Sequence, residues 1–225
     1  MTNHKRPTVL ITGTSRGIGK ATALKMLEEG YQVIGTATTE AGNVIRHPAF
    51  TGLKLDLSSV ADIKAFPERL KAVTSGPDIL INNAGVGDDV PFSEPEATTM
   101  DHTFKVNVYG LVLLTEALLP YMQAGSQIWM LSSAMSLMEN IEPNGPAYRM
   151  SKAAVNVYVK MLSQRVASRN IIVNALEPGW VKTDMGGIDA PVTPEEAAAF
   201  IYHTVRANKQ NGHFWLSTDR SSFSL

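Results

Sequence analysis

The fold is decided by the stretch Thr8-Val9-Leu10-Ile11-Thr12-Gly13-Thr14-Ser15-Arg16-Gly17-Ile18-Gly19. Its first five residues are β-branched or apolar and predict a short buried strand. Three glycines follow, and a helical pattern then continues to about Glu29. Gly30 comes next, where helices often end in a left-handed residue. A strand that turns through glycines into a helix is typical of the first unit of an α/β domain.

The same alternation of strand and helix continues along the chain. Further strands are predicted at residues 31–36, 53–56, 78–82, 127–132, 171–176 and 212–217. Most are continuously apolar, the pattern of parallel strands covered on both faces. Ser58 or Ser59 is expected to cap the helix after the third strand, and Pro194 to begin the last helix. The prediction is one doubly wound, Rossmann-type α/β domain over residues 1–225, with about seven parallel strands and helices on both faces.

Composition excludes several classes of protein. The 225 residues are 44% hydrophobic with a net charge of −1, so no overall charge attracts nucleic acid or an anionic membrane. The absence of cysteine excludes disulfides, thiolate nucleophiles and cysteine-ligated metals, and the five histidines show no ligand spacing, so no metal site is expected. Residues 1–7 are too short and polar for a signal peptide, and no apolar run reaches about 18 residues. A soluble cytoplasmic protein is expected.

The glycine turn is suited to bind phosphate. Gly13, Gly17 and Gly19 let the backbone turn tightly and approach a pyrophosphate, and the start of the following helix favours negative charge. Their spacing differs from the G-x-G-x-x-G pattern, and glycine-rich turns also occur for purely steric reasons. The position of this turn at the first strand favours a dinucleotide site at the carboxyl ends of the strands.

Tyr148 and Lys152 form a candidate acid–base pair. Four residues apart in a helix predicted at 147–167, they lie on one helix face. A free phenol has a pKa of about 10, and a neighbouring ammonium favours the phenolate. The spacing alone is common, because an amphipathic helix with a surface lysine also shows it.

A series of motifs then appears in a fixed order. They are Thr12 to Gly19, Asn82-Asn83-Ala84-Gly85, Asn107, Ser132-Ser133, Tyr148-Arg149-Met150-Ser151-Lys152 and Pro178-Gly179. From about Pro7 to Ser217 the chain resembles the classical short-chain dehydrogenase/reductase family. Residues 148–187 are most similar to its C-factor and sniffer-type carbonyl reductases, whereas the glycine turn and residues 35–38 resemble 3-oxoacyl reductases. The resemblance implies an NADP(H)-dependent enzyme that interconverts a carbonyl and an alcohol.

The resemblance also implies a role for each motif. Tyr148 would transfer the proton, and Lys152 would favour the phenolate and hold the nicotinamide ribose. Ser133 would hydrogen-bond the substrate oxygen, with Ser132 and Ser136 as alternatives because the following loop is long. Asn107 would hold a water linking Lys152 to solvent, or would satisfy a local helix defect. The implied cofactor-binding residues are Gly13, Ser15, Arg16, Gly17, Ile18, Gly19, Thr38, Asp56, Leu57, Asn83, Ala84, Gly85, Tyr148, Lys152, Pro178, Gly179, Val181 and Thr183.

Charge favours NADP over NAD. Members that bind NAD usually carry an acid at the end of the second strand, where this chain has Thr36-Ala37-Thr38-Thr39. Arg16 lies in the glycine turn, where an arginine reaches a 2′-phosphate, and Thr38 offers a hydroxyl. A solvent-exposed Arg16 without a cofactor role is the alternative. Asp56 would contact the adenine amino group or simply cap a helix.

The remaining expectations concern substrate and assembly. Substrate-pocket elements are expected at about residues 133–147 and 180–225, where Met135, Met138, Trp180 and Met185 line an open pocket or pack in the core. The helices at 106–119 and 147–167 are apolar on more than one face, and in the family they form a dimer interface, so a homodimer or homotetramer is expected. Two other functions stay open: a dedicated 3-oxoacyl-type reductase, and a nucleotide-binding signalling protein with incidental catalysis.

Overall fold

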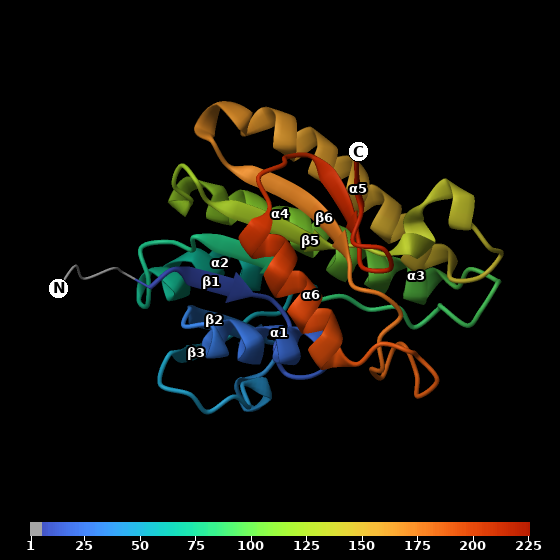
Figure 1. Ribbon diagram of the computed structural model, residues 1–225. Helices are drawn as coiled ribbons and strands as arrows, with labels where there is room; N and C mark the ends of the chain where they lie inside the picture. Colours follow the sequence, from blue (N-terminus) through green and yellow to red (C-terminus); the bar gives the residue numbers. More distant parts are fainter. Residues whose placement is uncertain (1–5) are drawn as a thin grey trace.

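A computed structural model describes residues 6–225, so the N-terminal stretch discussed above lies outside it except for Arg6 and Pro7. Eight strands form one sheet in the order β3-β2-β1-β4-β5-β6-β7-β8 (Figure 1). The first seven run parallel, and β8 pairs antiparallel with β7. The strands are β1 (Thr8–Ile11), β2 (Gln32–Ala37), β3 (Phe50–Lys54), β4 (Ile79–Asn82), β5 (Gln127–Leu131), β6 (Ile172–Glu177), β7 (His213–Leu216) and β8 (Ser222–Ser224).

The predicted doubly wound parallel sheet is confirmed, with one strand more than expected. The predicted position of the third strand, 53–56, is wrong. Its pairing with β2 runs from Val33 opposite Phe50 to Ala37 opposite Lys54. Leu55 and Asp56 have already left the sheet and turn toward its carboxyl edge, where both line a cavity.

Helices cover both faces of the sheet (Figure 1). They are α1 (Gly17–Glu28), α2 (Val60–Lys71), α3 (Ala97–Phe104), α4 (Leu111–Leu118), α5 (Pro146–Arg165) and α6 (Pro194–Ala207). The side chains of α1 and α6 share a hydrophobic core with one face, and those of α2, α4 and α5 share a larger core with the other. Within residues 6–225, no helix is both long enough and apolar enough to cross a membrane.

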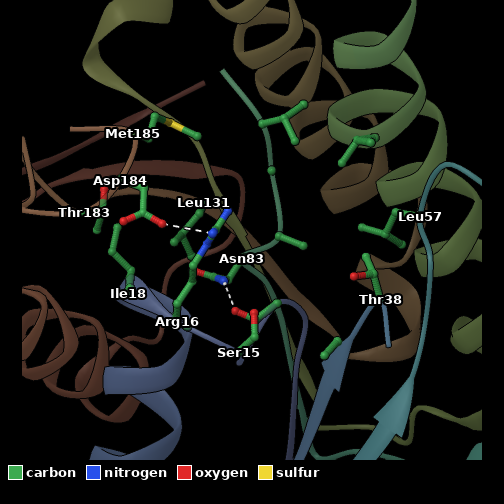
Figure 2. Close-up of a pocket in the computed structure, with 18 of the residues that line it drawn as sticks. Ser15, Arg16, Ile18, Thr38, Leu57, Asn83, Leu131, Thr183, Asp184 and Met185 are labelled. Atoms are coloured by element: carbon green, nitrogen blue, oxygen red, sulfur yellow. Dashed lines mark hydrogen bonds and ion pairs between the residues drawn. The ribbon is translucent and has the colours of Figure 1, made fainter. Parts of the chain in front are cut away.

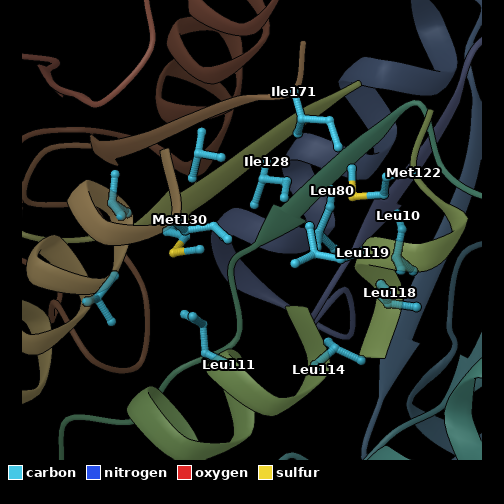
Figure 3. Close-up of a cluster of buried hydrophobic side chains, with 14 of the residues drawn as sticks. Leu10, Leu80, Leu111, Leu114, Leu118, Leu119, Met122, Ile128, Met130 and Ile171 are labelled. Atoms are coloured by element: carbon cyan, nitrogen blue, oxygen red, sulfur yellow. The ribbon is translucent and has the colours of Figure 1, made fainter. Parts of the chain in front are cut away.

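One side of α4 packs into the larger core. Figure 3 shows Leu111, Leu114 and Leu118 on one side of the helix, in a cluster that includes Leu80 and Met130 from the sheet. All five are at most 2% exposed. Full burial of one such side chain stabilises the fold by roughly 1.5–3 kcal/mol. The apolar side of the helix therefore fixes its distance from the strands.

The helix predicted at 106–119 is not regular. Residues Lys105–Gly110 are π-helical, and α4 begins only after them. A Cβ added at Gly110 would lie 2.2 Å from the carbonyl oxygen of Leu57. The two backbone segments are therefore too close for any residue with a side chain at position 110. The wide turn carries Asn107, and such insertions occur frequently at functional sites.

Helix ends follow the predicted signals. Gly30 has φ +86° after α1, and Ser59, not Ser58, caps α2 by accepting from the N–H of Asp62. Thr193 caps α6 in a capping box with Glu196, and Pro194 is the first helical residue. The strand order changes direction between β1 and β4, which places a crevice at the carboxyl ends of these two strands.

Candidate active site

A cavity of about 710 Å³ lies at this crevice (Figure 2). Most of the expected cofactor residues line it, namely Gly13, Ser15, Arg16, Gly17, Ile18, Gly19, Thr38, Asp56, Leu57, Asn83, Ala84, Gly85, Tyr148, Lys152, Pro178 and Thr183. Gly179, Val181, Asn107 and Ser133 do not border this cavity. Its size is within the range of small-molecule and cofactor sites.

Sequence reasoning missed several lining residues. Thr36, Ala37, Leu55 and Leu131 lie beside expected positions, and their places at strand ends are a signal that applies to any parallel sheet. His102 borders the cavity from α3, and no spacing in the sequence marks it. Other unanticipated lining residues are Thr39, Gly42, Val86, Val106, Lys182, Asp184 and Pro194. Met185, which was expected to line a pocket, and Ser132, an alternative for the catalytic serine, also line the cavity.

The glycine turn is held against β4 by the asparagine motif. The side-chain amide of Asn83 donates to the carbonyl oxygens of Thr12 at 2.7 Å and Gly13 at 3.2 Å. The Thr12 hydroxyl accepts from the N–H groups of Asn83 and Ala84, each at 3.0 Å. A Cβ added at Gly19 would lie 2.2 Å from the Gly13 oxygen. The backbone of the turn is therefore held in place, and it carries no side chain at its three glycines.

The start of α1 fits a phosphate. Arg16 occupies the N-cap position in extended conformation, and no side chain caps the helix. No acidic residue stands in its first turn. The first N–H groups of a helix need a partner, and an anion supplies it with the help of the helix dipole. The uncapped turn lies in the cavity wall, so the site fits a pyrophosphate.

The second strand ends in the same cavity without an acid. Thr36, Ala37, Thr38 and Thr39 all line it. The nearest acid in sequence, Glu40, begins a short 3₁₀ turn and is absent from the lining.

Arg16 lies across the cavity entrance. Its guanidinium pairs with the carboxylate of Asp184 at 3.0 Å, with both side chains largely exposed (Figure 2). An exposed ion pair contributes only about 0–1 kcal/mol to stability, so Arg16 can leave Asp184 for another anionic partner at little cost in free energy. Thr183 continues this wall, since its methyl group would be 3.2 Å from a Cβ added at Gly17.

Tyr148 and Lys152 meet at the inner end of the cavity. The Lys152 ammonium lies 5.6 Å from the centroid of the Tyr148 ring and donates to the carbonyl oxygen of Leu131 at 2.8 Å. Burial lowers the pKa of Lys152 to about 8. The pKa of Tyr148 is raised to about 12, mainly by burial. The hydroxyl of the neighbouring Ser133 opposes this shift, and the negative charge of Glu177 adds to it. Tyr148 is therefore a protonated phenol at neutral pH.

The three candidate serines have different surroundings. The Ser132 hydroxyl donates to Asn156 Oδ1 at 2.7 Å, and the Ser136 hydroxyl donates to the Ser133 carbonyl oxygen at 2.6 Å while it accepts from Asn156 Nδ2 at 2.8 Å. Both are buried in this network. Only the Ser133 hydroxyl faces Tyr148, and it also accepts from the N–H of Met135.

Asn107 links three segments behind the cavity. Its amide donates to the Val86 carbonyl oxygen at 2.8 Å and to the Ser151 hydroxyl at 3.0 Å, and its oxygen accepts from the Val86 N–H at 2.9 Å. A Cβ added at Gly85 would lie 3.1 Å from Asn107 Oδ1 and 3.5 Å from Lys152 Nζ. Asn107 thus lies within the π-helical turn and close to the ammonium.

The helix that carries Tyr148 is capped from a distant loop. Gly145 precedes α5 with φ +62° and has no side chain to cap it. Asp89, 5% exposed, accepts from the N–H of Ala147 at 2.6 Å and from that of Tyr148 at 3.3 Å. A carboxylate at a helix start is stabilised by the free N–H groups and the dipole. Asp89 therefore fixes the first turn of the helix.

Asp89→Ala is expected to lower the free energy of unfolding by about 1–2 kcal/mol, the usual effect of losing a helix cap. Asp89→Asn keeps an acceptor oxygen and should lose less. Asp88→Ala removes the exposed neighbour and serves as the matched control. Urea denaturation of the four proteins measures this, and equal stability of wild type and Asp89→Ala would contradict the capping role.

The loop before α5 is ordered by Arg149. Its buried guanidinium donates to the carbonyl oxygens of Met135, Asn140 and Asn144, and it pairs with Glu142 at 3.3 Å. The long loop after Ser133 is thus tied to α5.

The alternative of core packing for the expected pocket residues is wrong at three positions, since Met138, Trp180 and Met185 are 84%, 60% and 44% exposed.

Comparison with known proteins identifies the family. The sequence model described as short chain dehydrogenase matches residues 7–190. The chain therefore belongs to the short-chain dehydrogenase family of oxidoreductases, as its motifs indicate.

Individual relatives refine this assignment. The 3-oxoacyl-[acyl-carrier-protein] reductase FabG of Vibrio cholerae serotype O1 is 35% identical over 193 residues, which cover 81% of this chain and 77% of that protein. Among solved structures, the carbonyl reductase Sniffer of D. melanogaster has a TM-score of 0.87 at 26% identity, covering 98% of this chain and 100% of the other. An NADPH-bound carbonyl reductase from chicken fatty liver has a TM-score of 0.86 at 26% identity, covering 98% and 95%. The expected likeness to sniffer-type carbonyl reductases is confirmed.

Proposed function

We propose that the protein is an NADP(H)-dependent carbonyl reductase in which Tyr148 transfers the proton. The observation that carries this proposal is the position of a half-buried phenol beside a buried ammonium, in a cavity whose wall also includes the glycine turn. The bound nicotinamide would supply or accept the hydride. A protonated Tyr148 is the form needed to donate to the oxygen of a carbonyl being reduced.

Each neighbouring side chain has a distinct part in this proposal. Ser133 donates to the substrate oxygen as negative charge develops there. Lys152 stabilises the Tyr148 phenolate after proton transfer and binds the ribose hydroxyls. Asn107 holds the water through which Lys152 exchanges protons with solvent. Residues 133–147 and 180–225 provide the substrate pocket, within one oxidoreductase domain over residues 1–225.

The proposed cofactor is NADP(H), with NAD(H) less favoured. The lining end of β2 carries no acid. Among residues 6–225, the ion-pair partner of Arg16 in the glycine turn is the exposed Asp184, which a phosphate can replace. The chicken carbonyl reductase is described as NADPH bound, and a similar structure from Burkholderia multivorans, 25% identical, is described with bound NADP. Pro178, Gly179 and Val181 would border the nicotinamide, with Thr183 on its carboxamide and Asp56 near the adenine.

A second candidate is a reductase of 3-oxoacyl thioesters, because the curated relatives of 32–35% identity bear that name. The discriminating experiment is NADPH oxidation over dicarbonyls, quinones and 3-oxoacyl thioesters, with Tyr148→Phe as the blank. We expect turnover of several dicarbonyls and quinones. Turnover of thioesters alone would favour the second candidate, and a protein that binds NADPH but reduces nothing would overturn both.

The pH dependence of kcat/KM should reflect the protonation state of Lys152. Its pKa of about 8 predicts that kcat/KM for reduction, which reflects the free enzyme, is constant below pH 8 and falls above it as the ammonium is lost. The reason is that a neutral amine no longer stabilises the phenolate. In Lys152→Arg the charge persists to above about pH 12, so the fall should vanish although activity is lower. A wild-type profile that stays flat well above pH 8 would contradict this role.

We also propose a homodimer or homotetramer formed through α4, α5 and the π-helical turn. Tyr109, Leu113, Met150, Val157 and Met161 are 57%, 40%, 46%, 61% and 62% exposed on these elements. Exposed apolar side chains gathered on two neighbouring helices are typical of protein interfaces. Sedimentation velocity is the test, and a monomer at all concentrations would overturn the proposal.

A further inference from the structure

Glu177 is a buried acid that the proposed mechanism does not use. It is the last residue of β6 and is 6% exposed. Its carboxylate accepts from the N–H of Gly179 at 2.6 Å and from the hydroxyl and N–H of Ser217 at 3.0 and 3.3 Å. No ion pair within residues 6–225 includes it. Burying a charge without an opposite charge is costly, and neutral donors offset only part of the cost.

The carboxylate lies close to the reacting end of the cavity. The next residue, Pro178, lines the cavity, and a Cβ added at Gly179 would lie 3.1 Å from the Ser217 hydroxyl, so the segment packs closely against Ser217. The negative charge also reaches Tyr148, whose pKa it raises. Lys152 supplies the opposing positive charge, 5.6 Å from the centroid of the Tyr148 ring. The two charges therefore act on one small, poorly solvated region.

We propose that Glu177 sets the preference of the site for the oxidation state of its cofactor, because its carboxylate stabilises the positively charged oxidised nicotinamide and leaves the neutral reduced ring unaffected. This inference rests on the proposed function, which puts the nicotinamide beside Pro178 and Gly179. A site that binds the oxidised ring more tightly makes the bound reduced cofactor a stronger hydride donor. The same charge adds to the effect of burial, which is the main cause of the raised pKa that keeps Tyr148 protonated as the donor to the carbonyl oxygen. Both effects favour reduction of a carbonyl over oxidation of an alcohol.

The test is calorimetric titration of NADP⁺ and NADPH into wild type and Glu177→Gln. We expect the variant to bind NADP⁺ roughly tenfold more weakly, the effect of unit charges about 10 Å apart at an effective dielectric constant near 20. NADPH affinity should stay within about twofold, because an uncharged ring has no net charge for the carboxylate to attract. Glu177→Ser removes the same charge with a smaller side chain, so it carries the same expectation if the glutamine variant fails to fold.

Ser217→Ala is the matched control, because it keeps the carboxylate and loses one of its donors. Any effect of this variant should fall equally on the two forms of the cofactor. An unchanged ratio of the two dissociation constants in Glu177→Gln or Glu177→Ser would overturn the inference and leave the proposed function standing. A wild-type protein that binds neither form would overturn the proposed function and this inference together.

Discussion

Tyr148→Phe is expected to lower kcat for carbonyl reduction by at least about 10²-fold, the usual scale for loss of a general acid. The substitution removes one oxygen and leaves the ring, so the cavity wall and the contact with Lys152 persist. Affinity for NADPH should therefore change little. Steady-state kinetics and calorimetric titration of the same preparation separate the two quantities.

Ser133→Ala and Ser132→Ala make a useful comparison for this result. Ser133 faces the phenol, whereas Ser132 is engaged with Asn156 in a buried network. We expect Ser133→Ala to lower kcat strongly and Ser132→Ala to lower stability more than kcat. Turnover near the wild-type level in Tyr148→Phe would remove the tyrosine from its role and favour a different proton donor.

Arg16→Ala is expected to weaken NADPH binding and to spare NADH. A charge-assisted hydrogen bond contributes about 1.5–3 kcal/mol, which corresponds to roughly 10- to 150-fold in affinity. Ala37→Asp should act in the same direction, because it puts a carboxylate at the lining end of β2, where it repels a 2′-phosphate and accepts from ribose hydroxyls. The two changes together should reverse the preference, as measured by kcat/KM for both cofactors.

The ion pair between Arg16 and Asp184 provides the control. Asp184→Asn breaks the pair but leaves the guanidinium free, so NADPH binding should stay the same or improve. If Asp184→Asn instead reproduces Arg16→Ala, the arginine serves only to close the cavity entrance. If Arg16→Ala lowers kcat/KM equally for NADPH and NADH, the arginine contacts the pyrophosphate that both cofactors share. A wild-type preference for NADH would contradict the assignment of NADP(H).

The fold could be predicted from sequence where local and long-range signals agree. The first strand and its glycine turn were located correctly because the apolar run and the glycines mark the same boundary. The third strand was misplaced because its ends depend on pairing with β2, and the alternation of leucines that begins at Leu53 inside the strand continues at Leu55 and Leu57 beyond it. The π-helical turn was anticipated only as one alternative, a local helix defect at Asn107, and its bounds could not be predicted because Gly110 lies against the backbone of Leu57, which is far away in sequence.

The candidate site shows the same difference between residues marked by local sequence signals and residues that depend on long-range contacts. Motifs of fixed spacing located Tyr148, Lys152 and the glycine turn, and the structure brings these together in one cavity. Asp89 and Glu177 could not be found this way, since single acids in loops or at strand ends carry no periodic signal. Their burial and their backbone partners exist only once the sheet has formed.

The capping of α5 by Asp89 has a consequence for protein engineering. Donor and acceptor of this contact are 58 residues apart in the chain, since Asp89 follows β4 and Ala147 lies in the first turn of α5. A chimera of two family members that is spliced anywhere between these two positions takes the carboxylate from one parent and the helix start from the other. Splice points outside residues 89–148 keep the pair from a single parent, so libraries built with such junctions should contain more active members.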